Sequence, residues 1–89
     1  MVTSKDVFAK RKEGQLDEAY SMALQLMNAI NPDDWDIKAF GWCLIDLIKR
    51  EANTGNQQNL NHYKQQLESI TGPALDEVLA KGKDYALSL

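Results

Sequence analysis

Residues 14–34 contain apolar side chains at intervals of three and four, and this pattern constrains the chain to helical packing more strongly than any other feature. Gly14 permits a reversal before the helix. Asp17 and Glu18 place negative charge in its first turn, where the helix dipole favours it. Pro32 ends the helix because the residue before a proline is disfavoured in the helical conformation. The apolar positions form one broad buried stripe: Leu16, Ala19, Tyr20, Ala23, Leu26, Met27 and Ile30.

The next helix is predicted to begin at Asp33 or Asp34 and to continue through residue 51. Its main apolar stripe consists of Ile37, Phe40, Gly41, Leu44, Leu47 and Ile48, while Trp42 and Ile45 lie off this stripe. A helix that is apolar around most of its circumference is normally central in the fold. We therefore expect residues 14–31 and 34–50 to lie antiparallel and in contact, with the small side chains of Ala19 and Ala23 allowing close approach.

A shorter helix is predicted before these two, over residues 4–13. Thr3 and Asp6 have the spacing of a capping box at its start. Val7 and Phe8 are its main apolar anchors. No stretch of the chain combines the strict alternation and the β-branched enrichment that are typical of a strand.

The C-terminal part is predicted to hold a polar loop at residues 52–59 and two more helices. Asn56 and Asn59 are candidate caps for the first of these, whose narrow stripe is Leu60, Tyr63, Leu67 and Ile70. Pro73 suits the first position of the last helix. Gly82 interrupts that helix at a cost of about 1 kcal/mol relative to alanine, and it marks either a local weak point or close contact with another backbone. The last apolar stripe is Leu75, Val78, Leu79, Tyr85, Ala86 and Leu89. The sequence thus predicts an all-α fold of about five helices.

Length and composition limit the class of protein. A chain of 89 residues is expected to form one domain, residues 1–89. The formal charge of −3 argues mildly against nucleic-acid binding, for which a basic stripe is expected, and leaves a local basic patch open. The single cysteine, Cys43, cannot form an internal disulfide, which favours a reducing, cytoplasmic setting. No apolar run approaches the roughly 20 residues that a membrane span requires. The apolar residues 85–89 carry no stop signal, so the chain is either the N-terminal fragment of a longer protein or has its C-terminus docked on the core.

Two consecutive segments resemble a known repeat. Residues 37–44 read I-x-x-F-G-x-x-L, which reproduces the W-x-x-L-G-x-x-Y spacing of the tetratricopeptide repeat. Residues 14–19 read GQLDEA, and together with Ala23 and Pro32 they resemble the second helix of such a repeat and its closing proline. Over residues 1–70 the chain therefore resembles a divergent tetratricopeptide repeat (TPR) domain.

The chain departs from the family's pattern at several positions. Asp6 and Lys10 fall where apolar residues belong, and Ala23 replaces a bulky aromatic residue. The predicted loop at 52–59 is longer than the tight turn of a standard repeat. The resemblance implies two stacked antiparallel helical hairpins, with the last helix capping the open end of the stack.

The residues that could carry chemistry do not form a recognisable constellation. Metal sites and cysteine nucleophiles need several groups that converge, but Cys43 and His62, the only residues of their kinds, are nearly twenty positions apart. The acidic residues at 33–36 lack the glycine and glutamate of a calcium loop and are better explained as helix caps. The segment AKGKD at 80–84 lacks the spacing of a phosphate loop. We therefore predict no catalytic residue, no metal site, no cofactor and no enzymatic activity.

Trp35 and Trp42 are seven residues apart and so fall near one face of their helix. Tryptophan beside charged residues is typical of binding hot spots, but either ring could instead complete the core, and Trp35 could staple the start of the helix. In proteins of the resembled family, the first helix of each hairpin lines a groove that holds a partner segment. Carried over position by position, the resemblance implies these partner-binding residues: Arg11, Lys12, Lys38, Trp42, Ile45, Asp46 and Lys49.

The leading hypothesis is a non-enzymatic protein–protein interaction domain that binds a segment of another protein through this groove. The alternative is a small all-α structural domain whose apolar surface mediates homo-oligomerisation, with a homodimer as its simplest form. Neither hypothesis involves a membrane or a nucleic acid as the partner.

Overall fold

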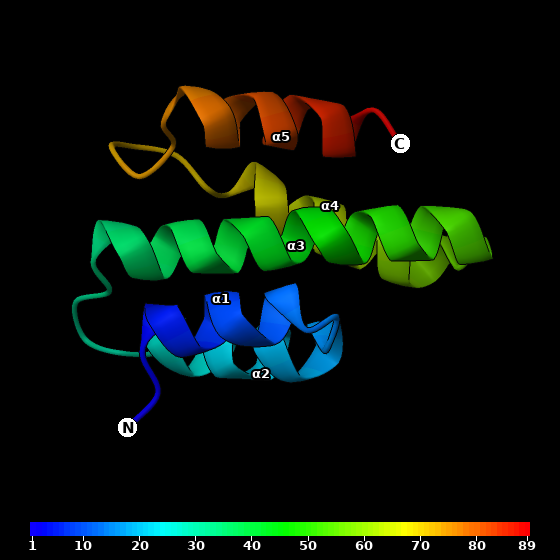
Figure 1. Ribbon diagram of the computed structural model, residues 1–89. Coiled ribbons are helices and arrows are strands. Elements are labelled where there is room, and N and C mark those ends of the chain that lie inside the picture. Colours follow the sequence, from blue (N-terminus) through cyan, green and yellow to red (C-terminus); the bar gives the residue numbers. More distant parts are fainter.

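The computed structural model describes all 89 residues and contains five helices and no strands. The helices are α1 (Ser4–Lys12), α2 (Leu16–Met27), α3 (Asp34–Thr54), α4 (Gln57–Glu68) and α5 (Glu77–Leu87). Successive helices run in opposite directions, so α1, α3 and α5 point one way and α2 and α4 the other (Figure 1). The prediction of an all-α fold with about five helices is confirmed.

The helices form two layers around α3. In Figure 1, α1, α3 and α5 lie in front, and α2 and α4 lie behind them. The central helix contacts each of the other four, whereas α1 and α5 lie on opposite sides of it and do not contact each other. The central position predicted for the helix after Asp33 is therefore confirmed. This arrangement leaves one face of α3 between α1 and α5.

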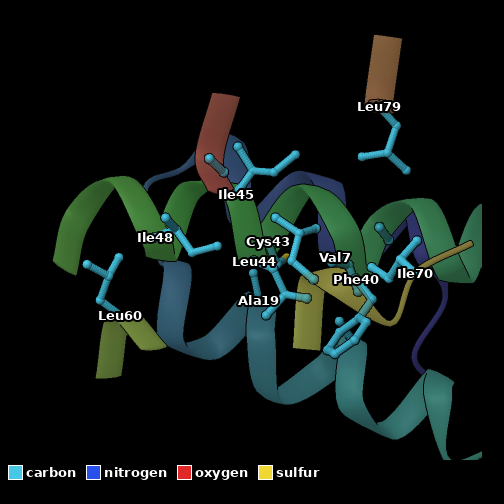
Figure 2. Close-up of a cluster of buried hydrophobic side chains, with 14 residues drawn as sticks. Val7, Ala19, Phe40, Cys43, Leu44, Ile45, Ile48, Leu60, Ile70 and Leu79 are labelled. Carbon is cyan, nitrogen blue, oxygen red and sulfur yellow. The ribbon is translucent and has the colours of Figure 1, made fainter. Parts of the chain in front are cut away.

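The hydrophobic core is built mainly from side chains of α3. Cys43, Leu44 and Ile48 are fully buried, and Figure 2 shows them among side chains from the surrounding helices. Those neighbours include Val7, Ala19, Leu60, Ile70 and Leu79. Removing such apolar surface from water stabilises a fold by roughly 25 cal/mol per Å². A helix that shares its circumference with four neighbours must be apolar on more than one side, and this explains the pattern of residues 37–48.

Helices α2 and α3 lie antiparallel and in contact, as predicted. Ala19 and Ala23 are both fully buried, and their small side chains let α2 approach its neighbours closely. Where the start of α2 meets the end of α3, the Arg50 guanidinium donates two hydrogen bonds to the Asp17 carboxylate, at 2.9 and 3.0 Å. The two helices are thus joined by apolar packing along their length and by an ion pair near the end of α3.

Reciprocal capping boxes begin α1 and α3. The Thr3 backbone N–H donates to Asp6 Oδ2 at 2.9 Å, and the Asp6 N–H donates back to Thr3 Oγ1 at 3.4 Å. The Asp33 N–H donates to Asp36 Oδ2 at 3.2 Å, and the Asp36 N–H donates to Asp33 Oδ1 at 2.8 Å. These bonds satisfy backbone donors that have no partner inside the helix. Asp33 and Asp36 therefore act as the capping box of α3, with Asp33 at the N-cap position.

The predicted C-terminal end of the second helix was wrong. Helix α2 ends at Met27, where the Asn28 N–H closes the last turn on the carbonyl of Leu24. Residues 28–33 cross from α2 to the cap of α3, so Ile30 lies outside the helix and is 95% exposed. Ile30 therefore does not belong to the buried stripe.

The predicted loop at 52–59 was also wrong. Helix α3 continues to Thr54, and only Gly55 and Asn56 separate it from α4. Gly55 adopts a left-handed conformation with φ of 78° and terminates α3. The Asn59 N–H donates to Asn56 Oδ1 at 3.2 Å, so Asn56 caps α4 and Asn59 lies inside it. A tight turn of this kind brings α3 and α4 into an antiparallel hairpin.

The last helix begins later than predicted. Asp76, rather than Pro73, marks the start of α5, because its Oδ1 accepts from the Leu79 N–H at 2.8 Å. Lys83 Nζ donates to the carbonyl oxygen of Ile70 at 2.8 Å and so ties α5 to the end of α4. Within α5, Val78 is 66% exposed and does not join the core.

None of the five helices combines the length and the apolar character that a membrane-spanning helix needs.

Candidate functional site

Six of the seven predicted site residues gather where α3 lies between α1 and α5, and Ile45 is the exception. We call this surface the α1–α3–α5 face and define it by Lys5, Phe8, Arg11, Lys12, Trp35, Lys38, Trp42, Asp46, Lys49 and Tyr85. Contacts between the three helices place most of these residues on one side of α3. The opposite side of α3 faces α2 and α4, where Tyr20 stacks on Phe40 and donates a hydrogen bond to Gln66 Oε1 at 2.7 Å.

Trp42 lies at the centre of this face, between α1 and α5. The guanidinium carbon of Arg11 lies 5.1 Å from the centroid of the Trp42 ring, which is the geometry of a cation–π contact. On the α5 side, a Cβ atom added to Gly82 would lie 3.1 and 3.2 Å from two carbons of the ring. Trp42 is therefore half-buried, and Gly82 marks close contact of α5 with side chains of α3 rather than with another backbone.

Ile45 has a different environment from the other predicted site residues. Its Cδ1 atom would lie 2.9 Å from a Cβ on Gly82, and its side chain is only 1% exposed. Figure 2 shows Ile45 in the core beneath the end of α5. Helix α5 covers the position that the resemblance assigned to an open groove. Ile45 therefore packs in the core and offers no surface to a partner.

Arg11 and Asp46 form an ion pair that joins α1 to α3. Arg11 Nε donates to Asp46 Oδ2, and Nη2 lies 3.5 Å from Oδ1. The Arg11 and Asp46 side chains are 31% and 19% exposed, so both charges are partly withdrawn from water. The same arginine thus pairs with Asp46 and covers the face of Trp42.

Lys38 connects the face to the start of α5. Its Nζ lies 3.3 Å from Asp76 Oδ2 and 4.6 Å from the centroid of the Trp35 ring. The backbone N–H of Leu79 holds the pKa of Asp76 below its usual value, and Lys38 lowers that pKa further. Lys38 therefore holds the carboxylate that caps α5 and also sits over an exposed aromatic ring.

The remaining predicted cations are exposed. Lys49 Nζ lies 5.4 Å from the centroid of the Tyr85 ring, and Tyr85 is 54% exposed. Lys12 is exposed on α1 and follows Lys5 by seven residues, so the two lie on the same side of that helix. Neither Lys5 nor Lys12 lies within ion-pair distance of a carboxylate.

An apolar hollow lies at the end of the face where α1 and α3 begin. It measures about 240 Å³ and is lined by Ser4, Lys5, Phe8 and Trp35. Phe8 and Trp35 meet edge to face, with ring centroids 6.5 Å apart. Trp35 is 60% exposed, which is unusual for a residue that normally buries its large apolar surface.

From the sequence alone the role of Trp35 was open, and Phe8 was predicted only as an apolar anchor of its own helix. Only the packing of α1 beside the start of α3 brings the two rings together. A sequence signal for Trp35 did exist, because it precedes Trp42 by seven residues on the same helix. No comparable signal identified Lys5 or Phe8, which lie on a different helix.

Cys43 and His62 are far from forming a reactive pair. Burial raises the pKa of the Cys43 thiol to about 12, and the negative charge of Asp46 adds to the effect. The thiol is therefore protonated at neutral pH and is fully buried in the core. His62 is exposed on α4 beside Tyr63. No three or more His, Cys, Asp or Glu side chains are grouped so that they could hold a metal ion.

No family model, curated protein or solved structure matches this chain. The α1–α3–α5 face therefore has to be interpreted from its own geometry.

Proposed function

We propose that this chain is a non-enzymatic, TPR-like protein-interaction domain that binds a segment of another protein along the α1–α3–α5 face. The single observation that carries the proposal is the exposure of Trp35 beside Phe8 in an apolar hollow. Large aromatic residues in such positions provide much of the binding energy of protein interfaces. The unpaired, buried Cys43 agrees with a cytoplasmic, reducing setting for the protein.

The helix layout supports a TPR-like interpretation. The first helix of each hairpin, α1 and α3, points the same way in the same layer, and α5 continues that layer (Figure 1). Within the matched motif, Phe40 and Leu44 are buried. A Cβ on Gly41 would lie 3.2 Å from Leu79 and 3.3 Å from Ile70, so a small residue at this position leaves room for the segment that follows α4.

The proposal is tested by selecting peptides from a random display library against the full chain and then measuring their affinity for variants. We expect Trp35→Ala to weaken binding of the selected peptides by about ten-fold or more, because truncating a hot-spot aromatic residue typically costs about 2 kcal/mol. Circular dichroism and urea unfolding must show that the variant remains folded.

Ile30→Ala is the matched control, because Ile30 is an exposed apolar residue that does not line the hollow. It should leave the affinity unchanged. Selected peptides that bind wild type and Trp35→Ala equally would overturn the assignment of this face.

Self-association is a second candidate function. Val78 and Tyr85 on α5 are exposed by 66% and 54%, and together with Trp35 they offer apolar surface to another copy of the chain. Light scattering over a wide concentration range separates the two candidates. A stable dimer in which the Trp35 fluorescence is shielded from a soluble quencher would favour self-association, and a concentration-independent monomer would favour the binding of a different protein.

A further inference from the structure

The α1–α3–α5 face has a charge opposite to that of the whole chain. The protein carries a formal charge of −3, yet the face holds five cations: Lys5, Arg11, Lys12, Lys38 and Lys49. Two carboxylates pair with cations of the face, Asp46 with Arg11 and Asp76 with Lys38, whereas Lys5, Lys12 and Lys49 form no ion pair. The residues that define the face therefore carry more positive than negative charge, and the unpaired Lys5, Lys12 and Lys49 are available to a partner.

Three of the four aromatic rings of this face are already covered by cations. All three cation–π contacts of the structure lie here: Arg11 over Trp42, Lys38 over Trp35 and Lys49 over Tyr85. A ring whose face is occupied by a cation is less available for stacking with a nucleic-acid base. The hollow between Phe8 and Trp35 remains open, and it offers ring edges and apolar surface.

From this arrangement we infer the chemistry of the partner. The face binds an acidic segment of another protein that carries one large apolar side chain, which enters the hollow between Phe8 and Trp35. Carboxylates that follow that side chain along the segment pair with the cations of α1 and α3. This inference rests on the proposed function of the same face and adds the class of partner.

The positions of the cations set the length of the segment. Lys5 lines the hollow itself, and Lys38 follows Trp35 by one helical turn. Residues 35–49 extend over roughly 21 Å of helix axis at 1.5 Å per residue. An extended segment of about six or seven residues covers that distance. A segment of this length with its apolar residue near one end would place its acidic residues along the remaining cations.

A second copy of the chain is a poor occupant on charge grounds. In a two-fold symmetric dimer each face would meet itself, so the cations of one copy would lie against those of the other. Like charges across an interface cost binding free energy. An acidic segment from a different protein avoids this repulsion and also gains from the excess positive charge.

The experiment uses a fluorescein-labelled peptide of glutamate and serine with one leucine near one end, titrated into the full chain and followed by anisotropy. Two matched probes replace the glutamates by glutamine or the leucine by alanine. We expect each replacement to weaken binding by about ten-fold or more, and we expect added salt to weaken the acidic probe far more than the glutamine probe.

Charge-reversal variants connect the effect to the face. Lys5→Glu and Lys12→Glu should each weaken the acidic probe several-fold, whereas Lys64→Glu on α4 should leave its affinity nearly unchanged. All three substitute lysines outside the core, and circular dichroism verifies that each variant is folded. Equal effects of the three substitutions would mean that only net charge matters, which would overturn the inference.

The outcomes also separate this inference from the proposed function. Peptides from the display library that need Trp35 but show no acidic enrichment and no response to Lys5→Glu would overturn the acidic partner and leave the proposed function intact. If neither the library nor the acidic probe yields any binding that depends on Trp35, both the inference and the proposed function are overturned. A labelled oligouridylate that binds more tightly than the acidic probe, in a manner dependent on Trp35, would identify a nucleic acid as the ligand and overturn the inference. A dimer that hides Trp35 would also overturn the inference.

Discussion

Gly82 of α5 lies directly against the ring of Trp42 on α3, so a single added methyl group at position 82 would come within 3.1 Å of a ring carbon. The same methyl group would lie 2.9 Å from Ile45 Cδ1. This contact explains why a residue that is unfavourable inside a helix occupies the middle of α5. It also determines how closely α5 covers α3 and hence the shape of the proposed binding face.

Substitutions at Gly82 should destabilise the protein in order of size. Gly82→Ala gains up to about 1 kcal/mol of helix propensity, but the steric conflict with the Trp42 ring opposes that gain, since overpacking costs about 1–3 kcal/mol. We expect Gly82→Ala to be destabilising by about 1 kcal/mol and Gly82→Val by more. Urea unfolding followed by circular dichroism measures both changes.

Ile45→Val provides the test of mechanism, because it removes the Cδ1 atom nearest to position 82. In the double variant Ile45→Val/Gly82→Ala, the loss of stability should be smaller than the sum of the two single losses. Strict additivity would show that the contact between α3 and α5 does not constrain position 82.

The Arg11–Asp46 pair should contribute measurably to the attachment of α1. Both side chains are partly withdrawn from water, and Arg11 also lies over Trp42. A double-mutant cycle with Arg11→Ala and Asp46→Ala should give a coupling energy of roughly 1 kcal/mol, at the upper end of the range for exposed pairs. The coupling should decrease at high salt, and a coupling of zero would show that the pair does not hold α1 in place.

Arg50→Ala should destabilise the protein more than Asp17→Asn. Arg50 pairs with Asp17, whose side chain is 77% exposed, and also with Glu51, whose side chain is only 7% exposed. Asp17→Asn should lower the free energy of unfolding by only roughly 0.5 kcal/mol, because an exposed ion pair is screened by water. Removing Arg50 leaves the buried Glu51 carboxylate without its cation and should cost roughly 2 kcal/mol or more. Thermal unfolding compares the two variants.

A pH series and a second-site substitution add controls to this comparison. The hydrogen bond from Arg50 holds the pKa of Asp17 below its ordinary value of 3.8. The stabilisation is therefore fully present above pH 3.8 and is lost as the pH falls through the lower folded-state value. Asp17→Asn should remove that part of the acid sensitivity.

Glu51→Gln, combined with Arg50→Ala, should recover part of the lost stability, and no recovery would contradict the role given to Glu51.

The Cys43 thiol should be unreactive in the native protein. Burial raises its pKa to about 12 from an ordinary value of 9.0, and the thiolate is the reactive form. Labelling with a thiol reagent at neutral pH should therefore be slow in the native state and fast in denaturant. Rapid stoichiometric labelling of the folded protein would contradict the buried position.

The same shift gives a stability prediction at alkaline pH. The folded state holds the thiol proton more tightly than the unfolded chain does, so the contribution of Cys43 is fully present below about pH 9 and is lost as the pH rises toward 12. Cys43→Ala should have a shallower loss of stability over that range than wild type. Parallel slopes for the two proteins would argue against the shifted pKa.

The sequence by itself determined the number and order of the helices and the pairing of α2 with α3. The capping boxes at Thr3 and Asp33 and the apolar spacing of residues 16–27 act over three or four positions, so they can be recognised locally. The true ends of α2 and α3 were less predictable, because polar residues such as Asn53 and Thr54 are compatible with both a loop and a last helical turn.

Only the tertiary structure decided how the predicted site residues are used. It buried Ile45 beneath α5, placed Trp42 between Arg11 and Gly82, and brought Phe8 to Trp35 at an open hollow. These relationships join residues that are 27 to 40 positions apart in the sequence. Local patterns carry no information about them, because they depend on the distances and angles at which α1 and α5 pack on either side of α3.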